Sequence, residues 1–179
     1  KNYFYPDLPK GYQISQYEHP IVRGGEIILP SGKKVRLTRV HLEEDTANLV
    51  HNAEGNTLVD FNRAGIPLME LVTEPDLRSA KEACEAAEEL QLIFQYIGAS
   101  RARMQWGEMR VEANVSLRPK GSETFGTKVE LKNINSFKAV ERAILYEIER
   151  QRQMLEEGGT IEQHTRGWDE AKGETVLQR

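Results

Sequence analysis

The sequence predicts an α+β fold, an antiparallel sheet with flanking helices, and three observations favour this class. Residues 109–118 and 128–132 alternate between polar and apolar side chains, which is typical of strands with one buried face. Residues 79–98 and 136–158 carry apolar side chains at helical spacing. With 39% hydrophobic and 29% charged residues in 179, the composition is that of a globular chain, and we expect a single domain over 1–179.

Composition also excludes several classes of protein. Lys and Arg number 24 and Asp and Glu number 28, so the net charge of −4 disfavours a general polyanion binder, which needs clustered cations. No apolar run approaches roughly 18 residues, so we expect no membrane span. The single cysteine, Cys84, excludes an internal disulfide and a multi-cysteine zinc site and fits a reducing compartment; we expect no zinc here.

The N-terminal half predicts loops and short strands. The first twenty residues are rich in aromatic and turn-forming residues, and we expect an ordered loop whose rings are covered by the protein body. Segments 26–29 and 34–42 around the turn 30–32 predict a hairpin. In its second strand, the alternation of apolar residues shifts by one position near Thr38 or Arg39, which indicates a bulge. Two further apolar runs, 57–62 and 68–72, predict two more strands.

Two helices frame the second half. Ser79 and Glu82 fit a capping box, in which each side chain accepts a hydrogen bond from the free backbone N–H of the other residue. Gly98 ends the apolar pattern. The second helix is predicted from Ser136 to the glycines at 158–159. We expect its buried stripe to consist of Phe137, Val140, Ile144, Ile148 and Leu155. Segments 160–165 and 175–177 predict a last hairpin.

The two alternating strands predict a polar face of mixed charge. A short loop joins them, so we expect an antiparallel pair whose residue numbers sum to about 244, with Glu112 opposite Lys132 and Asn114 opposite Glu130. One interpretation is an ordinary solvated sheet face with cross-strand ion pairs. The other is a site where carboxylates hold Mg²⁺ and lysines neutralise phosphate oxygens.

An acidic triplet adds to the second interpretation. Glu43, Glu44 and Asp45 follow a predicted strand and supply hard oxygen ligands, although a solvated hairpin end would have the same composition. His41 stands beside them, either as a ligand or as a hydrogen-bonded structural histidine. The sequence contains no Walker loop and no nucleophile elbow, so a P-loop kinase is excluded and a serine hydrolase has no support.

Several motifs lie along essentially the whole chain, among them an aromatic run, an acidic triplet and a Glu-Leu-Lys-Asn motif; they are residues 1–17, 40–45, 58–65, 74–79, 112–116, 125–128, 130–137 and 168–173. Together these motifs resemble the GatB family, the B subunits of aspartyl/glutamyl-tRNA(Asn/Gln) amidotransferases. The resemblance implies the catalytic cradle of that family, an α+β structure on an antiparallel sheet.

The resemblance also implies an activity. Family members act in the cytoplasm, or in an organelle matrix in a eukaryote, together with a GatA amidase and a GatC subunit. They use ATP and Mg²⁺ to phosphorylate the side-chain carboxylate of Glu-tRNA(Gln) or Asp-tRNA(Asn). Ammonia from glutamine, released in the amidase and carried through a tunnel, then displaces the phosphate. The enzyme class implied is a carbon–nitrogen ligase with glutamine as amide donor.

Site residues are carried over by position. The metal ligands implied are Glu43, Glu44 and Glu130. The catalytic residues implied are Glu112, Glu130 and Lys132. The phosphate and substrate contacts implied are Asn114, Lys128, Lys132 and Asn133. Lys1 and Lys10 match a segment near the tunnel exit. Glu112 stands where the family more often has Asp, and residues 104–108 also depart from the family pattern.

Family members also contain a preceding Gly-Leu-Glu-Val-His segment and following helical domains that bind tRNA. Neither is in this sequence, so we expect the central part of the cradle, incomplete for activity alone. The alternatives are a non-catalytic scaffold, a tRNA-docking fragment, or an archaeal GatE-type enzyme acting on Glu-tRNA(Gln) alone. The residues do not choose between the two tRNA substrates.

Overall fold

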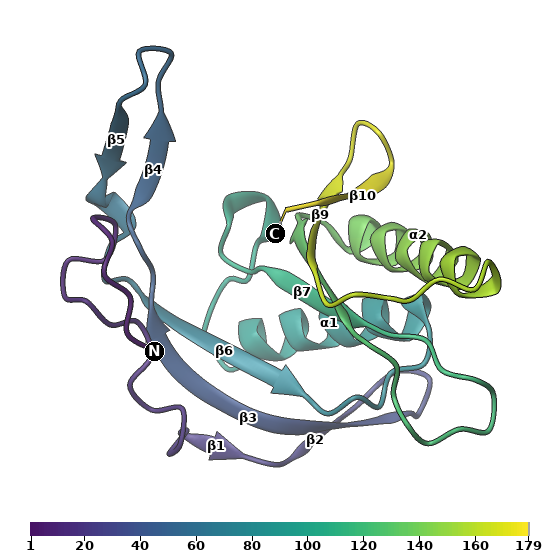
Figure 1. The fold of residues 1–179 in the computed structure, drawn as a ribbon. Helices are drawn as coiled ribbons and strands as arrows, with labels where there is room; N and C mark the ends of the chain where they lie inside the picture. The colour runs from purple at the N-terminus through teal and green to yellow at the C-terminus, as the bar shows by residue number, and fades with distance from the viewer. Residues whose placement is uncertain (179) are drawn as a thin grey trace. The chain divides into compact units, whose positions relative to one another are not determined.

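A computed structural model describes residues 1–178 and confirms the α+β class (Figure 1). The chain divides into two compact units, Lys1–Asp76 and Leu77–Arg179. The expected single domain stays a prediction. Among the described residues, no helix is both long and apolar enough to cross a membrane.

The first unit is built on one long strand. This strand, β3, pairs antiparallel with three shorter ones; the four are β1 (Val22–Arg23), β2 (Glu26–Ile28), β3 (Lys34–Glu44) and β6 (Pro67–Thr73). The predicted hairpin is therefore confirmed. The bulge is confirmed as well, because the pairing of β3 with β6 shifts between Leu37 and Arg39.

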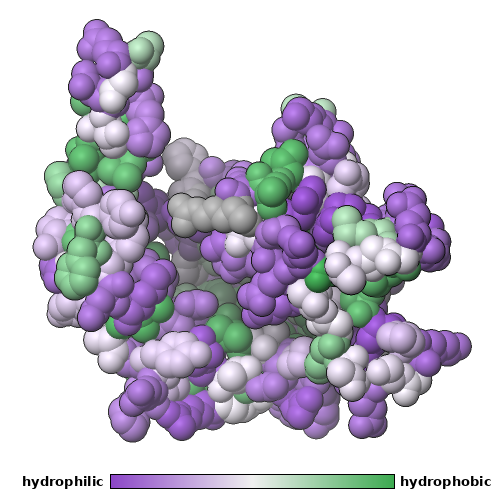
Figure 2. All heavy atoms as spheres, in the orientation of Figure 1, coloured by the Kyte–Doolittle hydropathy of each residue, from purple (hydrophilic) through white to green (hydrophobic). Residues whose placement is uncertain are grey.

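A separate two-stranded hairpin, β4 (Asn48–His51) and β5 (Thr57–Asp60), extends away from β3 and β6 (Figure 1). The 3₁₀ turn η1 (Phe61–Arg63) follows it, so the predicted strand 57–62 ends two residues early. Figure 2 shows mostly polar residues over the hairpin tip and apolar ones near its base. Buried Asp45 fixes that base, since its carboxylate accepts from Arg63 at 2.8 Å and its backbone bonds both Gly65 and Ile66.

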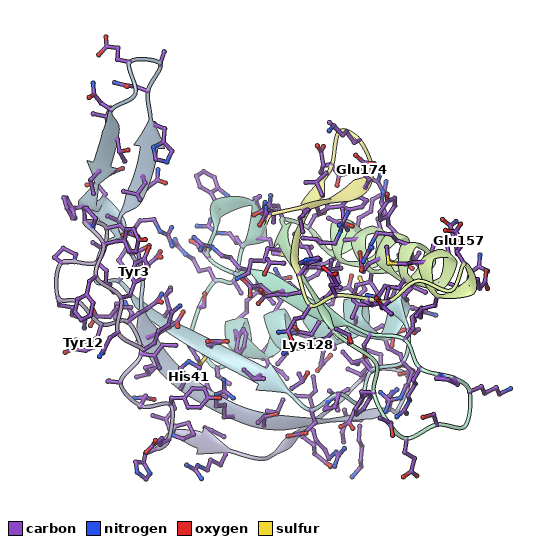
Figure 3. The ribbon with its side chains drawn as sticks, viewed as in Figure 1. Tyr3, Tyr12, His41, Lys128, Glu157 and Glu174 are labelled. Atoms are coloured by element: carbon purple, nitrogen blue, oxygen red, sulfur yellow. The ribbon has the colours of Figure 1, made fainter. Side chains whose placement is uncertain are left out.

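The N-terminal segment is ordered, but its aromatic rings are not covered. Phe4 is 82% exposed and Tyr5 63% exposed, so the expectation of covered rings is wrong. Some of these rings pack on one another or on a cation instead of on a core: Tyr3 stacks on Tyr5, and Lys10 lies 4.3 Å from the centroid of Tyr12. Tyr3 and Tyr12 are labelled in Figure 3.

The second unit is a four-stranded sheet with two helices. The sheet order is β10-β9-β8-β7, and its elements are α1 (Ala80–Tyr96), η2 (Met104–Trp106), β7 (Val111–Val115), β8 (Val129–Ile134), α2 (Phe137–Glu156), β9 (Thr165–Asp169) and β10 (Glu174–Leu177). Strands β8 and β9 run parallel, and the other pairs are antiparallel. The main core lies between α2 and one face of this sheet, where Val129, Leu131 and Val140 are fully buried.

Both helix starts agree with the sequence. Ser79 and Ser136 are the N-caps, each accepting from the backbone N–H three residues later at 3.1 Å. At the first helix, Glu82 accepts from the backbone N–H of Arg78, the residue before the N-cap, at 2.6 Å.

The buried stripe of α2 is also corrected. Val140 and Ile144 are buried as predicted, but Leu155 is 44% exposed, and the stripe continues instead through Glu147 and Gln151. Polar residues at these two positions conceal the stripe from a search for apolar periodicity. The end of α2 therefore packs through hydrogen bonds rather than through leucine.

Glu147, fully buried, joins α2 to the last two strands. Its carboxylate accepts from Arg150 at 2.7 Å, from the Thr175 hydroxyl at 3.1 Å and from Gln151 at 2.8 Å. Arg166 of β9 adds a second cation 3.7 Å away. Because these partners surround the charge with hydrogen bonds and cations, the carboxylate is retained in a core that would otherwise exclude it.

The last hairpin begins later than predicted. Residues 160–164 are outside any strand. In the hairpin of β9 and β10, Arg166 pairs with Leu177 at one end and Asp169 pairs with Glu174 at the other. The polar run before Thr165 contacts the edge of β8 instead, where the backbone N–H of Glu130 donates to the carbonyl of His164 at 3.0 Å.

We expect Cys84 to be unreactive. Burial raises the pKa of its thiol to about 11, helped by the nearby Glu88 and Glu141 carboxylates, and its Sγ donates to the Phe137 carbonyl at 3.4 Å. Little thiolate is then present at pH 7. Alkylation by a thiol reagent followed by mass spectrometry should be slow in the native protein and fast in denaturant; rapid native labelling would contradict this.

Candidate functional site

The mixed-charge face predicted for the second unit is present. Asn114 lies opposite Glu130 and Val115 opposite Val129, which is the predicted register, with a shift between Val111 and Ala113. The Lys132 ammonium lies 3.0 Å from a Glu112 oxygen and 3.7 Å from a Glu130 oxygen. The three charged side chains therefore share one face of the β7–β8 pair, opposite the core.

Lys132 is held in its charged form. Burial opposes its charge, but hydrogen bonds and Coulomb attraction from Glu112 and Glu130 outweigh burial and raise its pKa above the usual value. At neutral pH the group is therefore an ammonium. It can neutralise an anion, and it cannot serve as a general base.

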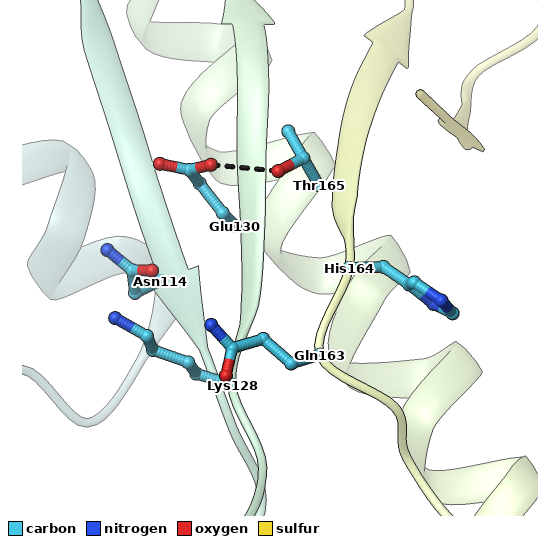
Figure 4. Close-up of a pocket in the computed structure, with 6 residues that line it drawn as sticks. All are labelled: Asn114, Lys128, Glu130, Gln163, His164 and Thr165. Atoms are coloured by element: carbon cyan, nitrogen blue, oxygen red, sulfur yellow. Dashed lines mark hydrogen bonds between the residues drawn. The ribbon is translucent and has the colours of Figure 1, made fainter. Parts of the chain in front are cut away.

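Glu130 is fixed from its other side by β9. The Thr165 hydroxyl donates to Glu130 Oε2 at 2.9 Å, and the two residues are paired across the parallel strands (Figure 4). The second oxygen, Oε1, is the one nearest Lys132. The carboxylate thus has one oxygen oriented by a neutral donor and one facing the charged cluster.

A pocket of about 330 Å³ opens beside this carboxylate. It is lined by polar residues of β7, of β8 with the residue before it, and of β9 with the two residues before it; they are Asn114, Lys128, Glu130, Gln163, His164 and Thr165. In Figure 4 the amide groups of Asn114 and Gln163 and the Lys128 ammonium gather on one side of the pocket, while His164 points away. A cation and two amides beside a carboxylate can receive an anionic group together with a hydrogen-bond donor.

The sequence predicted only part of this lining. Asn114, Lys128 and Glu130 were expected on one face, and the structure brings them together. Gln163, His164 and Thr165 were missed, because they reach the pocket through the parallel pairing of β9 with β8. The only signal in the sequence is the polar character of 163–165, which is equally typical of a loop.

Asn133 is not in the lining. It lies near the end of β8 with a φ of 60°, a left-handed conformation uncommon outside glycine, and its side chain lies over Gly167, where an added Cβ would be 2.9 Å from its Nδ2. Its predicted contact with phosphate or substrate therefore stays a prediction with no support from the pocket geometry.

In the first unit, Glu43 belongs to a potential cation cluster. His41, Glu43 and Glu70 each place one ligand atom within 4.8 Å of the others, on the β3–β6 pair (Figure 3). The carboxylate oxygens suit a hard divalent cation such as Mg²⁺. Glu70 was not predicted, because only the pairing of β6 with β3 places it opposite His41.

His41 lies next to the two carboxylates of this cluster. Its ring is fully buried, and Nδ1 accepts from the Arg39 Nε–H at 3.3 Å, so in the neutral ring the proton is on Nε2. Nε2 lies 3.0 Å from Glu70 Oε2, at ion-pair distance but without the geometry of a hydrogen bond. In this tautomer Nε2 offers no lone pair, so two carboxylates are the fitting ligands for Mg²⁺ and the histidine contacts one of them.

Glu44 points to the other side of β3 from Glu43, as neighbours on a strand do. It forms an ion pair with Lys10, and Gln13 donates to its backbone carbonyl at 3.2 Å. Lys1 Nζ donates to Gln13 Oε1 at 3.2 Å. Of the two predicted tunnel-exit lysines, Lys1 therefore contacts Gln13 and Lys10 contacts Glu44. A joint role of Glu44 and Glu130 stays a prediction, since each belongs to its own unit.

Comparison with known proteins identifies the family. The family described as "GatB/GatE catalytic domain" matches residues 1–179. Relatives named as B subunits of aspartyl/glutamyl-tRNA(Asn/Gln) amidotransferases include those of Chlorobium luteolum, 54% identical, and Roseiflexus sp., 56% identical, both over 100% of this chain. The chain spans 38% and 37% of the length of these two relatives. Similarity of this extent shows that the chain belongs to the GatB/GatE catalytic-domain family.

Proposed function

We propose that this chain supplies part of the site at which a tRNA-dependent amidotransferase activates a side-chain carboxylate with ATP. The substrate would be the glutamyl or aspartyl group of Glu-tRNA(Gln) or Asp-tRNA(Asn), and the partners would be a GatA amidase and GatC. The observation that carries the proposal is the arrangement of Glu112, Lys132 and Glu130 beside a polar pocket. The names of the relatives support the substrate class.

The chemistry explains why such a face is needed. A carboxylate resists attack by ammonia because it has no good leaving group. In the proposed first step, a substrate carboxylate oxygen bonds to the γ-phosphorus of ATP, and the bond from that phosphorus to the bridging oxygen breaks, releasing ADP. In the second step ammonia adds to the acyl carbon, and inorganic phosphate leaves with the electron pair of the acyl–oxygen bond. Both steps depend mainly on positioning and charge neutralisation.

The residues of the second unit have separate tasks in this proposal. Lys132, kept protonated by its two neighbours, contacts the oxygens of the transferring phosphoryl group. Lys128 and Asn114 in the pocket receive the substrate carboxylate and hold it against that group. Glu112 and Glu130 orient Lys132 and provide oxygen ligands for Mg²⁺.

Mg²⁺, when bound, would supply positive charge that offsets the charge of the phosphate oxygens. Within the first unit, Glu43 and Glu70 offer a carboxylate pair for such a cation, and His41 Nε2 lies 3.0 Å from Glu70. Glu44 is already paired with Lys10.

Lys132→Met tests the proposal in a complete complex. The substitution removes the cation and keeps most of the aliphatic length, so we expect ATP-dependent amide formation to fall by about a hundredfold, the scale of one preorganised electrostatic contact. Glutamine hydrolysis by the amidase should persist. The assay measures phosphate release from ATP and amidated aminoacyl-tRNA together.

Lys81→Met is the matched control, because Lys81 is an exposed residue of α1 whose ammonium lies 3.9 Å from Glu85. It should leave both rates unchanged. Wild-type amidation by Lys132→Met would mean that the phosphoryl group is bound elsewhere, and the proposed function of this face would be wrong.

A further inference from the structure

Thr165 is the residue of the pocket whose contact is best defined. Its hydroxyl donates to Glu130 Oε2 at 2.9 Å, a hydrogen bond between two side chains of the described pocket lining. We propose that Thr165 is a positioning residue that orients the Glu130 carboxylate for the reaction. This inference rests on the proposed function of Glu130.

The backbone of Thr165 is fixed on both sides. The neighbouring carbonyl of His164 accepts from the Glu130 N–H at 3.0 Å, and the Thr165 carbonyl accepts from the Gln178 N–H at 2.9 Å. A β-branched side chain on a strand has few available χ1 rotamers, so the direction of the hydroxyl is restricted too. The donor is therefore in place before any substrate binds.

The chemistry of the donor matters as much as its position. Glu112 is held by an ammonium, at 3.0 Å from Lys132, whereas Glu130 Oε2 is held by a neutral hydroxyl. Lys132 already lies 3.7 Å from Oε1, and a second cation at Oε2 would further reduce the negative charge that Glu130 offers to Mg²⁺ or to a substrate donor. The hydroxyl orients the carboxylate and leaves that charge intact, with Oε1 facing the charged cluster.

The same unit contains a second threonine–glutamate pair that serves as a contrast. The Thr175 hydroxyl donates to Glu147 at 3.1 Å, but both residues are buried and the carboxylate has two arginine neighbours. That pair contributes to packing between α2 and β10. The Thr165–Glu130 pair instead borders the pocket, where the Glu130 side chain is 35% exposed.

The test compares three variants in the complete complex. Thr165→Val keeps the shape and removes the donor, and we expect kcat for amide formation to fall by about 10- to 100-fold, with KM for the aminoacyl-tRNA changed by less than about threefold. Thr165→Ser restores the donor and should recover most of kcat. Thr175→Val should lower the melting temperature with kcat unchanged at temperatures where the protein is folded.

The outcomes separate this inference from the proposed function. If Thr165→Val retains wild-type kcat, or if Thr165→Ser is as slow as Thr165→Val, the hydroxyl does not position Glu130 and the inference is wrong. Glu130→Gln is measured beside them: wild-type amidation by Glu130→Gln would overturn the proposed function as well. If Thr165→Val slows Glu130→Gln no further, the threonine acts through Glu130.

Discussion

Glu130→Gln is expected to slow ATP-dependent amide formation by about a hundred- to thousandfold in the complete complex. The substitution keeps the size of the side chain and can keep the contact with Thr165, but it removes the charge that faces Lys132 and the proposed Mg²⁺. Loss of one preorganised electrostatic contact costs about 3–4 kcal/mol of transition-state stabilisation, which corresponds to this range. We expect the same direction for Glu44→Gln.

The measurement separates activation from ammonia supply. Phosphate release from ATP and amidated aminoacyl-tRNA should fall together, while glutamine hydrolysis, whose nucleophile we place on the amidase, should remain. Glu157→Gln, at the exposed end of α2, is the matched control and should behave as wild type. If both Glu130→Gln and Glu44→Gln amidate at the wild-type rate, these residues are not part of the phosphoryl-transfer site.

Glu147→Ala is expected to destabilise the protein by about 3–5 kcal/mol, because it leaves partly buried cations without their counter-charge. Arg150 and Arg166 would lose their shared carboxylate, and Thr175 and Gln151 would lose a hydrogen-bond acceptor. Denaturant unfolding followed by circular dichroism measures the change. Glu149→Ala, two residues along the same helix, removes an exposed ion pair with Arg152 and an exposed hydrogen bond from Gln153, so it should destabilise the protein far less.

The same residue predicts a pH dependence. Burial favours the protonated form of Glu147, but hydrogen bonds from Arg150, Gln151 and Thr175 outweigh it and lower the pKa below the usual 4.5. A carboxylate whose pKa is lower in the folded state stabilises that state above pH 4.5, and this stabilisation is lost as pH falls through the folded pKa.

Glu147→Gln isolates this contribution, because glutamine keeps the size of the side chain and does not titrate. The free energy of unfolding, measured in denaturant at a series of pH values, should favour the wild type most above pH 4.5. The difference between the two proteins should shrink as pH falls below that value. A difference that stays constant into the acid range would show that Glu147 does not contribute to acid unfolding.

The structural features that could be predicted are those that depend on the order of polar and apolar residues within one segment of the chain. The β7–β8 register followed from alternation and a short loop, and it placed Glu112, Lys132 and Glu130 on one face correctly. The bulge at Leu37–Arg39 followed from a change of phase. Both predictions succeeded because a strand shows its two faces in its own residues.

The failures share a different cause. Thr165 reaches the pocket and Glu70 reaches His41 through pairings between segments, and neither residue has a distinctive neighbour in the sequence. Glu147 was missed because a buried carboxylate is indistinguishable from a solvated one until its arginines are placed. The exposed rings of Phe4 and Tyr5 were expected to be covered because apolar surface usually is.

The parallel pairing of β8 with β9 has a consequence for the order in which the site assembles. Glu112, Glu130 and Lys132 lie on neighbouring strands, a contact of shorter range that can form early. Thr165 lies 35 residues after Glu130, with all of α2 between them in the sequence, so their contact has a longer range. During synthesis the charged residues therefore emerge from the ribosome before the hydroxyl that orients one of them. When α2 packs on the sheet and β9 pairs with β8, the cluster of charges becomes an oriented site.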